Sequence, residues 1–134
     1  MGLFDFLFSR PKKTFGVVRH SLTSEKEAST RENWQKIEEL LKLGKPSQLR
    51  QAVIEGDKIV DGVLRELVLG STMGERLKSA RDLFSREAYN RLWEAHKIRN
   101  SLVHEAGFEP PYYVCKEAVE KLRESLVALN IRLR

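Results

Sequence analysis

Apolar residues return every three or four positions along most of this chain, which is the spacing of one face of an α-helix. The pattern begins near Ser29 and continues to the end of the sequence. No segment shows the alternation of apolar and polar residues that is typical of a β-strand. The sequence therefore predicts an all-α fold, a helical bundle of four long helices plus one short helix.

Capping residues divide this pattern into separate helices. Ser29 and Glu32 have the spacing of a capping box, so the first helix is expected to begin there and to end before Gly44. The chain from Thr14 to Ala28 is polar and has no apolar period, which predicts a linker. Residues 1–28 are therefore interpreted as an N-terminal aromatic and basic segment with a linker, and residues 29–134 as one helical domain.

The same reasoning places the next two helices. A second helix is expected from about Ser47 to Leu69, with Gly70 as its terminator. A capping box at Thr72 opens a short third helix that is expected to end around Phe84.

Ser85 begins the predicted fourth helix, which is expected to end near Gly107. The dipeptide Pro110-Pro111 blocks continuation and presets the first turn of the fifth helix. The apolar stripe of that helix consists of Cys115, Val119, Leu122, Leu126, Leu129 and Leu133. Its excess of leucine is interpreted as exposed surface consistent with a contact to a second subunit.

The first thirteen residues form a distinct segment. Phe4, Phe6, Leu7 and Phe8 precede a small cluster of cations at residues 10–13. The positive charge follows the apolar stretch, so the segment does not have the order of a secretory signal. Two interpretations stay open: peripheral membrane contact through residues 1–13, or a tail that packs on protein or stays loose.

Composition limits the classes of protein without choosing a function. A chain of 134 residues with 41% hydrophobic content has the size and polarity of one globular domain. The net charge of +5 is compatible with a nucleic-acid partner. Cys115 is the single cysteine, which indicates an inert core thiol in a reducing compartment. The expected location is the cytoplasm, with the inner face of the membrane as the alternative if residues 1–13 bind lipid.

The most unusual position is Arg99, which falls inside the apolar arc of the predicted fourth helix. That arc is made of Leu92, Ala95, Leu102, Val103 and Ala106. A buried guanidinium keeps its proton and needs a carboxylate, carbonyls or a phosphate as partner. His104 lies on the flank of the same helix, and histidine is the residue type that can exchange a proton near neutral pH. The plainer interpretation is a snorkelling or structurally paired arginine beside a histidine that caps the helix end.

The predicted second helix supplies a partner for Arg99. Asp57 lies at the edge of its apolar arc, next to Gly56, which would allow a neighbouring helix to approach closely. One hypothesis is that Asp57 accepts a hydrogen bond or ion pair from Arg99 or from His104. The other is that Asp57 is solvated at the boundary of the core.

The sequence Arg99-Asn100 followed by His104 resembles the motif of the HEPN superfamily, in which four to six residues separate an arginine from a histidine, and Asn, Asp or His is favoured directly after the arginine. The resemblance implies a HEPN-like helical domain and metal-independent endoribonuclease activity, with attack by the RNA 2′-hydroxyl. It assigns Arg99 to the phosphate and His104 to proton transfer, and Asn100 would orient the phosphate or His104 through its amide. It also implies a homodimer, an RNA substrate, a cognate antitoxin or inhibitor, and a toxin or defence process.

Helix geometry agrees with a requirement for two copies. Residues five apart point about 140° away from each other and are separated by about 7.5 Å of helical rise, so one Arg99 and His104 pair does not converge. Two copies across a twofold axis would form one composite cleft. Ala106 stands where toxins of this family often have a modified tyrosine, which speaks against that regulation.

No other chemistry is predicted. The three histidines and the cysteine lack the spacing of a zinc site, there is no glycine-rich phosphate loop, and no cofactor is expected. Trp34 and Trp93 are interpreted as core residues rather than base-stacking platforms. The alternative function is a non-catalytic nucleotide-binding or scaffold module, membrane-associated through its aromatic N-terminal segment, in which Arg99 forms a structural ion pair.

Overall fold

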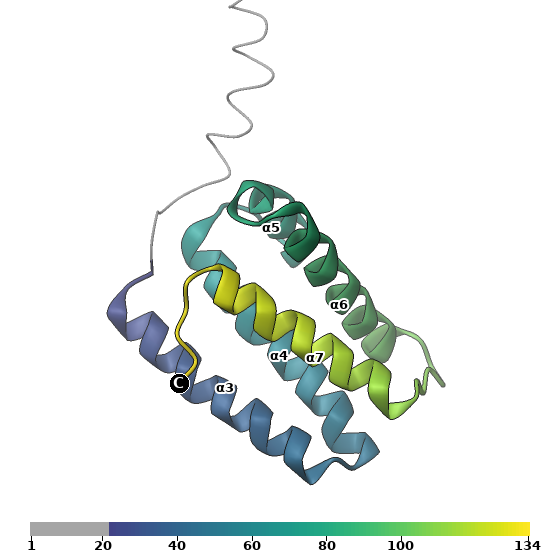
Figure 1. Cartoon of the computed structure of the whole chain (residues 1–134). Coiled ribbons are helices and arrows are strands. Elements are labelled where there is room, and N and C mark those ends of the chain that lie inside the picture. The colour runs from purple at the N-terminus through teal and green to yellow at the C-terminus, as the bar shows by residue number, and fades with distance from the viewer. Residues whose placement is uncertain (1–21) are drawn as a thin grey trace, which may run out of the picture.

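The computed structural model describes residues 22–134, and every regular element within that range is a helix (Figure 1). The long helices are α3 (Ser24–Leu43), α4 (Pro46–Leu67), α6 (Arg86–His104) and α7 (Tyr112–Ala128). The short helix α5 (Met73–Ser79) and the 3-10 turn η1 (Arg81–Leu83) connect α4 to α6. Helices α3 and α6 run in one direction, and α4 and α7 run in the other. The predicted all-α class is confirmed for the described residues.

Helix α3 begins earlier than the sequence pattern predicted. Thr23 is its N-cap, and the hydroxyl of Thr23 accepts the N–H of Lys26 at 3.1 Å. The hydroxyl of Ser29 donates instead to the carbonyl of Lys26, inside the helix. The predicted start at Ser29 is therefore wrong, and residues 24–28 are helical rather than linker. No residue from 24 to 29 is buried, so these turns carry no apolar period that would have marked them as helix.

Most other predicted boundaries are close to those observed. Gly44 ends α3 with a left-handed φ of 72°, and Thr72 caps α5 by accepting the N–H of Glu75. Ser85 caps α6 in the same way, through the N–H of Ala88. Helix α6 ends at His104, one turn before the predicted Gly107.

Helix α7 stops well before the end of its predicted apolar stripe. Asn130 adopts a left-handed φ of 67°. The N–H of Ile131 bonds to the carbonyl of Leu126 at 3.1 Å, which is a Schellman ending. The chain then folds back, and Ile131 and Leu133 reach the core from the tail. The prediction that the helical stripe continues through Leu129 and Leu133 is wrong, because this turn intervenes.

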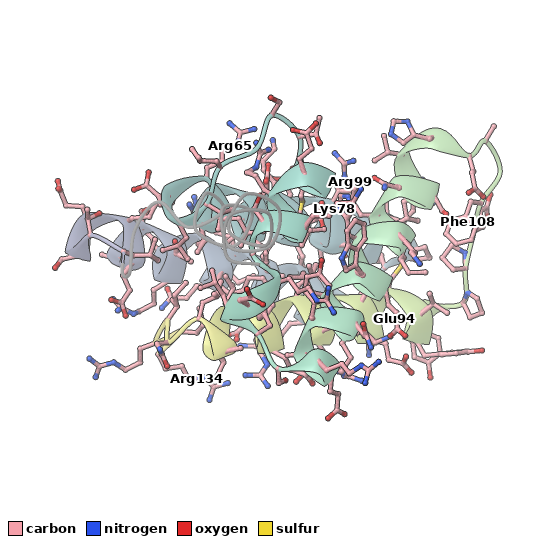
Figure 2. All side chains as sticks on the ribbon, turned by 90° about the horizontal axis from the view of Figure 1, so that it is seen from above. Arg65, Lys78, Glu94, Arg99, Phe108 and Arg134 are labelled. Carbon is pink, nitrogen blue, oxygen red and sulfur yellow. The ribbon has the colours of Figure 1, made fainter. Side chains whose placement is uncertain are left out.

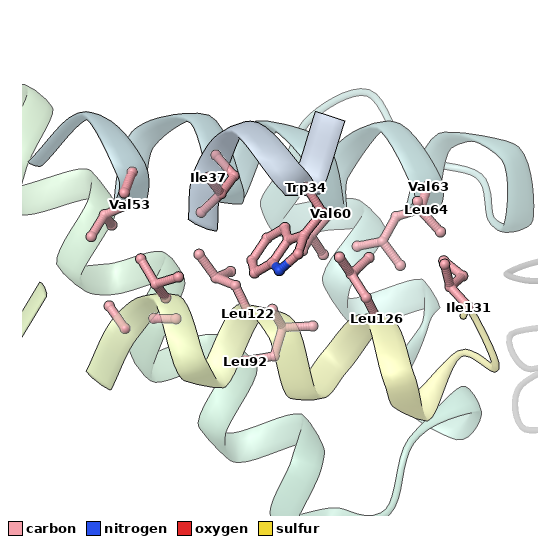
Figure 3. Packing of buried hydrophobic residues seen from close by; sticks show 14 of the residues in the cluster. Trp34, Ile37, Val53, Val60, Val63, Leu64, Leu92, Leu122, Leu126 and Ile131 are labelled. Carbon is pink, nitrogen blue, oxygen red and sulfur yellow. The ribbon is translucent and has the colours of Figure 1, made fainter. Parts of the chain in front are cut away.

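The core lies between α3, α4, α6 and α7 (Figure 3). A Cβ on Gly56 would lie 3.2 Å from Leu122 Cδ1 and 3.5 Å from Trp34 Cζ3, so the glycine does allow close helix packing. Leu122 and Leu126 are fully buried, which shows that the interpretation of α7 leucines as exposed surface was wrong. These leucines face the other helices of the same chain.

Cys115 lies in this core and is 3% exposed. Burial raises the pKa of its thiol, so the thiolate is disfavoured, as expected of an inert core residue. Among the helices of residues 22–134, none is both long and apolar enough to cross a bilayer. The residues predicted to contact a membrane, Phe4, Phe6, Leu7 and Phe8, lie outside the described part of the chain.

Candidate functional site

Three charged residues on one side of α4 connect this helix to the segments that surround it. Arg50 donates to the carbonyls of Phe108 at 2.9 Å and Leu102 at 3.3 Å, which holds the C-terminal end of α6. Asp57 contacts α6 at its middle, and Asp61 contacts α5. We call Arg50, Asp57 and Asp61 the α4 polar row. Because it holds α6 at two levels, the row fixes the register of α6 against α4.

Asp57 is the centre of a buried polar cluster. Its exposed fraction is 2%, and Nδ1 of His96 lies 3.1 and 3.2 Å from its two carboxylate oxygens. Nε of Arg99 lies 3.6 Å from Oδ2 of the same carboxylate. The predicted ion pair of Asp57 with Arg99 is therefore present, whereas the alternatives of a contact to His104 and of a solvated Asp57 are wrong. We call Asp57, His96 and Arg99 the Asp57 cluster.

Sequence reasoning missed His96 as a member of this cluster. It is 6% exposed and lies one helical turn before Arg99, so both side chains reach the same part of α4. The i, i+3 spacing of His96 and Arg99, together with the expected Arg99–Asp57 pair, was the signal that could have found it. Nδ1 donates in this contact, because an ionised carboxylate offers acceptors only.

Burial raises the pKa of Asp57 above its ordinary range. The hydrogen bond and charge of His96, and then the charge of Arg99, act in the opposite direction. The nearby Asp61 adds a small further upward shift. Ionised Asp57 is therefore sustained by His96 and Arg99 together, at a position where an isolated carboxylate would be strongly disfavoured.

The inner part of the Arg99 side chain is fixed by protein contacts, and its outer end is accessible to solvent. Its side chain is 33% exposed, and Nη1 donates to Oδ1 of Asn100 at 3.0 Å. Its buried Nε has no hydrogen-bond partner within the described chain. Viewed from above, Arg99 and Arg65 lie toward one side, opposite Glu94 and Arg134 (Figure 2). Arg99 thus has a fixed base and N–H donors left over for an anion.

His104 is the last residue of α6 and is exposed. No contact joins it to Arg99 or Asp57 in the part of the chain that is described. Val103, predicted to face the core, is 45% exposed, and Ala106 lies beyond the helix end and is also exposed. The predicted apolar arc is therefore wrong at these two positions, because Val103 faces solvent beside the buried Leu102 and Ala106 follows the last residue of α6. One chain alone does not bring Arg99 and His104 together.

A row of aromatic rings leads along α6 toward the Asp57 cluster. Ring centroids are 6.4 Å apart between Phe84 and Tyr89, 6.4 Å between Tyr89 and Trp93, and 5.9 Å between Trp93 and His96. All but His96 are half-buried. Trp34, at 1% exposure, is a core residue as predicted, whereas Trp93 lies at the boundary of the core.

A hollow of about 570 Å³ opens at the start of this aromatic row. It is lined by Arg81, Asp82, Phe84, Arg86, Tyr89 and Asn90. A second hollow, of about 400 Å³, lies at the opposite end of α6, between the start of α4 and the segment from Gly107 to Pro110. Within residues 22–134 there is no group of three or more histidine, cysteine or acidic side chains arranged to hold a metal ion.

The chain was compared with protein-family models, curated proteins and solved structures, and none of them matches it.

Proposed function

We propose that this chain is a HEPN-type endoribonuclease with a HEPN-like four-helix bundle, and that it cuts RNA without a metal ion. Arg99 binds the phosphate, His104 transfers protons, and Asn100 orients Arg99. The resemblance of the Arg99-Asn100 and His104 pattern supplies the reaction class. The structural observation that supports it is the state of Arg99, a guanidinium anchored through Asp57 and Asn100 with donors still free.

An anchored arginine is suited to a transition state with added negative charge. Its orientation is set before the substrate arrives, so little rearrangement is needed as charge develops on the phosphate. The N–H groups of an arginine with a purely structural role would be expected to donate to acceptors of the protein itself, as those of Arg76 do. Arg76 is 6% exposed and donates to both oxygens of Asp61 and to the carbonyl of Gly70. The contrast between these two arginines favours an external anion as the partner of Arg99.

The proposed reaction needs only proton transfer and charge stabilisation. A 2′-hydroxyl of the RNA loses its proton and attacks the adjacent phosphorus, and the bond from phosphorus to the 5′-oxygen breaks. The 5′-oxygen takes up a proton, which gives a 2′,3′-cyclic phosphate and a 5′-hydroxyl. An imidazole such as that of His104 can carry these protons near neutral pH.

A homodimer completes the proposed site. Arg99 and His104 diverge on one helix, so the cleft is built from two α6 helices related by a twofold axis. Val103 lies between them in sequence and exposes an apolar side chain, as expected for a residue at such a contact. Lys58 on α4 and Lys97 on α6 are exposed and form no salt bridge with another described residue, which suits an RNA partner.

The test is RNA cleavage by purified protein in the presence of a chelator. Wild-type protein should yield fragments with 2′,3′-cyclic phosphate ends, and Arg99→Lys and His104→Asn should each lower the rate at least 100-fold. A substrate with a single ribonucleotide in a DNA strand should be cut after that nucleotide, and its all-deoxy counterpart should stay intact.

Contaminating nuclease gives the same products, so the variants must be purified in parallel with the wild type. Lys42→Gln, in the exposed last turn of α3, is the matched control and should cleave at the wild-type rate. Equal cleavage by all preparations would identify a contaminant. Intact RNA at high wild-type concentration would refute the ribonuclease and favour a non-catalytic module.

A further inference from the structure

We propose that the hollow between η1 and the start of α6 binds a nucleotide of single-stranded RNA, with its base on Tyr89 and its phosphate between Arg81 and Arg86. This hollow lies apart from Arg99, His104 and Asn100. The inference deepens the proposed function because it names a second contact for the same substrate class. Binding can nevertheless be measured separately, with an RNA that cannot be cleaved.

The cations that line the hollow are available to a ligand. Arg81 and Arg86 are both exposed, and neither forms a salt bridge with a residue in the described range. They differ in this from Arg91 and Arg123, which are each bound in bidentate fashion to a glutamate. Two unpaired guanidinium groups beside one hollow form a site for phosphate oxygens.

The aromatic lining distinguishes a nucleotide from a simple anion. Phe84 and Tyr89 line the same hollow and are half-buried, so their rings are held in place by neighbours while part of each stays accessible. Bases of single-stranded RNA stack on rings of this kind, next to cations that follow the backbone. Binding of inorganic phosphate alone would not require aromatic rings.

The remaining lining residues fit the edge of a base. Asn90 offers both a donor and acceptors, and Asp82 offers acceptors only. The charge of Asp82 opposes phosphate binding, but Arg81 and Arg86 outnumber it. The N-terminus of α6 begins at the hollow and adds its positive dipole end to the same side.

Helix α6 connects this hollow to the proposed catalytic residues. Tyr89 and Arg99 are ten residues apart on the helix, which corresponds to about 15 Å of rise and a difference in direction of about 80°. The rings of Trp93 and His96 lie between them in the aromatic row. A single strand that follows α6 would contact the hollow a few nucleotides from the phosphate at Arg99.

Binding is tested with the full chain and a fluorescein-labelled 2′-O-methyl RNA octamer, which lacks the hydroxyl needed for cleavage. In anisotropy titrations with chelator, Tyr89→Leu should weaken binding at least tenfold, whereas Tyr89→Phe should stay within twofold of wild type. Arg81→Gln and Arg86→Gln should each weaken binding and reduce the salt dependence, log K against log salt, by about 0.7. Lys42→Gln, on the exposed end of α3, is the matched charge control and should bind as wild type.

Tyr89 also contacts Phe84 and Trp93, so each variant is first checked by thermal melting. If Tyr89→Leu is folded and binds as tightly as Tyr89→Phe, the proposal is overturned, and a nonspecific polyanion surface remains. Tyr89-dependent binding without any cleavage by wild type would support this site and refute only the proposed ribonuclease.

Discussion

Asp57 of α4 and His96 of α6 form a buried contact, with Nδ1 of the imidazole 3.1 Å from one carboxylate oxygen and 3.2 Å from the other. The guanidinium of Arg99 approaches the same carboxylate less closely, at 3.6 Å. His96 is therefore the primary partner of Asp57. The N–H groups of Arg99 that have no partner in the protein can therefore donate to an external phosphate while Asp57 keeps a hydrogen-bond donor.

Replacement of His96 should destabilise the fold much more than replacement of His104. His96→Ala removes the nearest donor to a carboxylate that is 2% exposed, and we expect a loss of about 2–4 kcal/mol in the free energy of unfolding. His104→Ala changes an exposed side chain at a helix end and should stay within about 0.5 kcal/mol. Urea unfolding of both variants measures the difference, and equal effects would contradict the role given to His96.

The raised pKa of Asp57 gives a pH dependence with a definite sign. A carboxyl group with a higher pKa in the folded state binds its proton more tightly there, so its contribution to stability is greatest at low pH. That contribution is lost as the pH rises from about 4, the usual aspartate value, through the raised value. The free energy of unfolding of the wild type relative to Asp57→Asn should therefore be greatest below about pH 4 and should decline as the pH rises above that value.

Urea titrations of both proteins at several pH values give this difference. A wild-type advantage that grows with pH over this range would mean that the effects of His96 and Arg99 on the pKa of Asp57 outweigh the effect of burial.

Asp57→Asn should also lower the rate of RNA cleavage, because Arg99 loses its charged anchor. If neither stability nor cleavage changes, the ion pair of Asp57 with Arg99 has no role.

Arg76 and Asp61 provide a second stability prediction, because their pair is bidentate and almost buried. Arg76→Met leaves Asp61 without its main partner and releases α5 from α4, and we expect a loss of about 3 kcal/mol. Arg123→Met removes an equally bidentate but exposed pair with Glu120 and should cost less than about 1 kcal/mol. Chemical unfolding gives the loss in free energy of unfolding for each variant. Similar losses would show that burial of the ion pair does not determine its contribution to stability.

Sequence pattern predicted the interior of the helices better than their ends. Trp34, Leu64 and Leu122 carry the apolar period and are buried as that period requires. The start of α3 was misplaced because Thr23 and Ser29 are both good N-caps, and the largely polar residues between them carry no apolar period that would favour the earlier start. Helix α7 ends where Asn130 adopts a left-handed conformation. The sequence did not indicate this end, because the apolar period continues to Leu133.

The candidate site was predictable only where a charge interrupted an apolar face. Arg99 and Asp57 were found for that reason, and their contact followed from the antiparallel pairing of two helices. His96 carries no such conflict, since a neutral imidazole is tolerated at the boundary of a core. Its role depends on the register of α6 against α4, which is set by contacts of Arg50 to distant backbone carbonyls. Local sequence holds no information on those contacts.

The proposed composite site can be tested by mixing two inactive variants. Arg99→Ala and His104→Ala each remove one type of working residue from both halves of a homodimer. After joint unfolding and refolding, half of the dimers should contain one variant of each kind, with one intact Arg99 and one intact His104. If the cleft is assembled from both chains, the mixture should recover activity well above the sum of the separate variants.

Val103→Glu supplies the complementary measurement. A carboxylate at this exposed apolar position on α6 should separate the proposed dimer, and it should abolish cleavage while the monomer keeps its helical content. Sedimentation at several concentrations records the state of association, and circular dichroism records the fold. Full cleavage by a monomeric Val103→Glu protein, together with no recovery in the mixture, would place Arg99 and His104 in a site within a single chain.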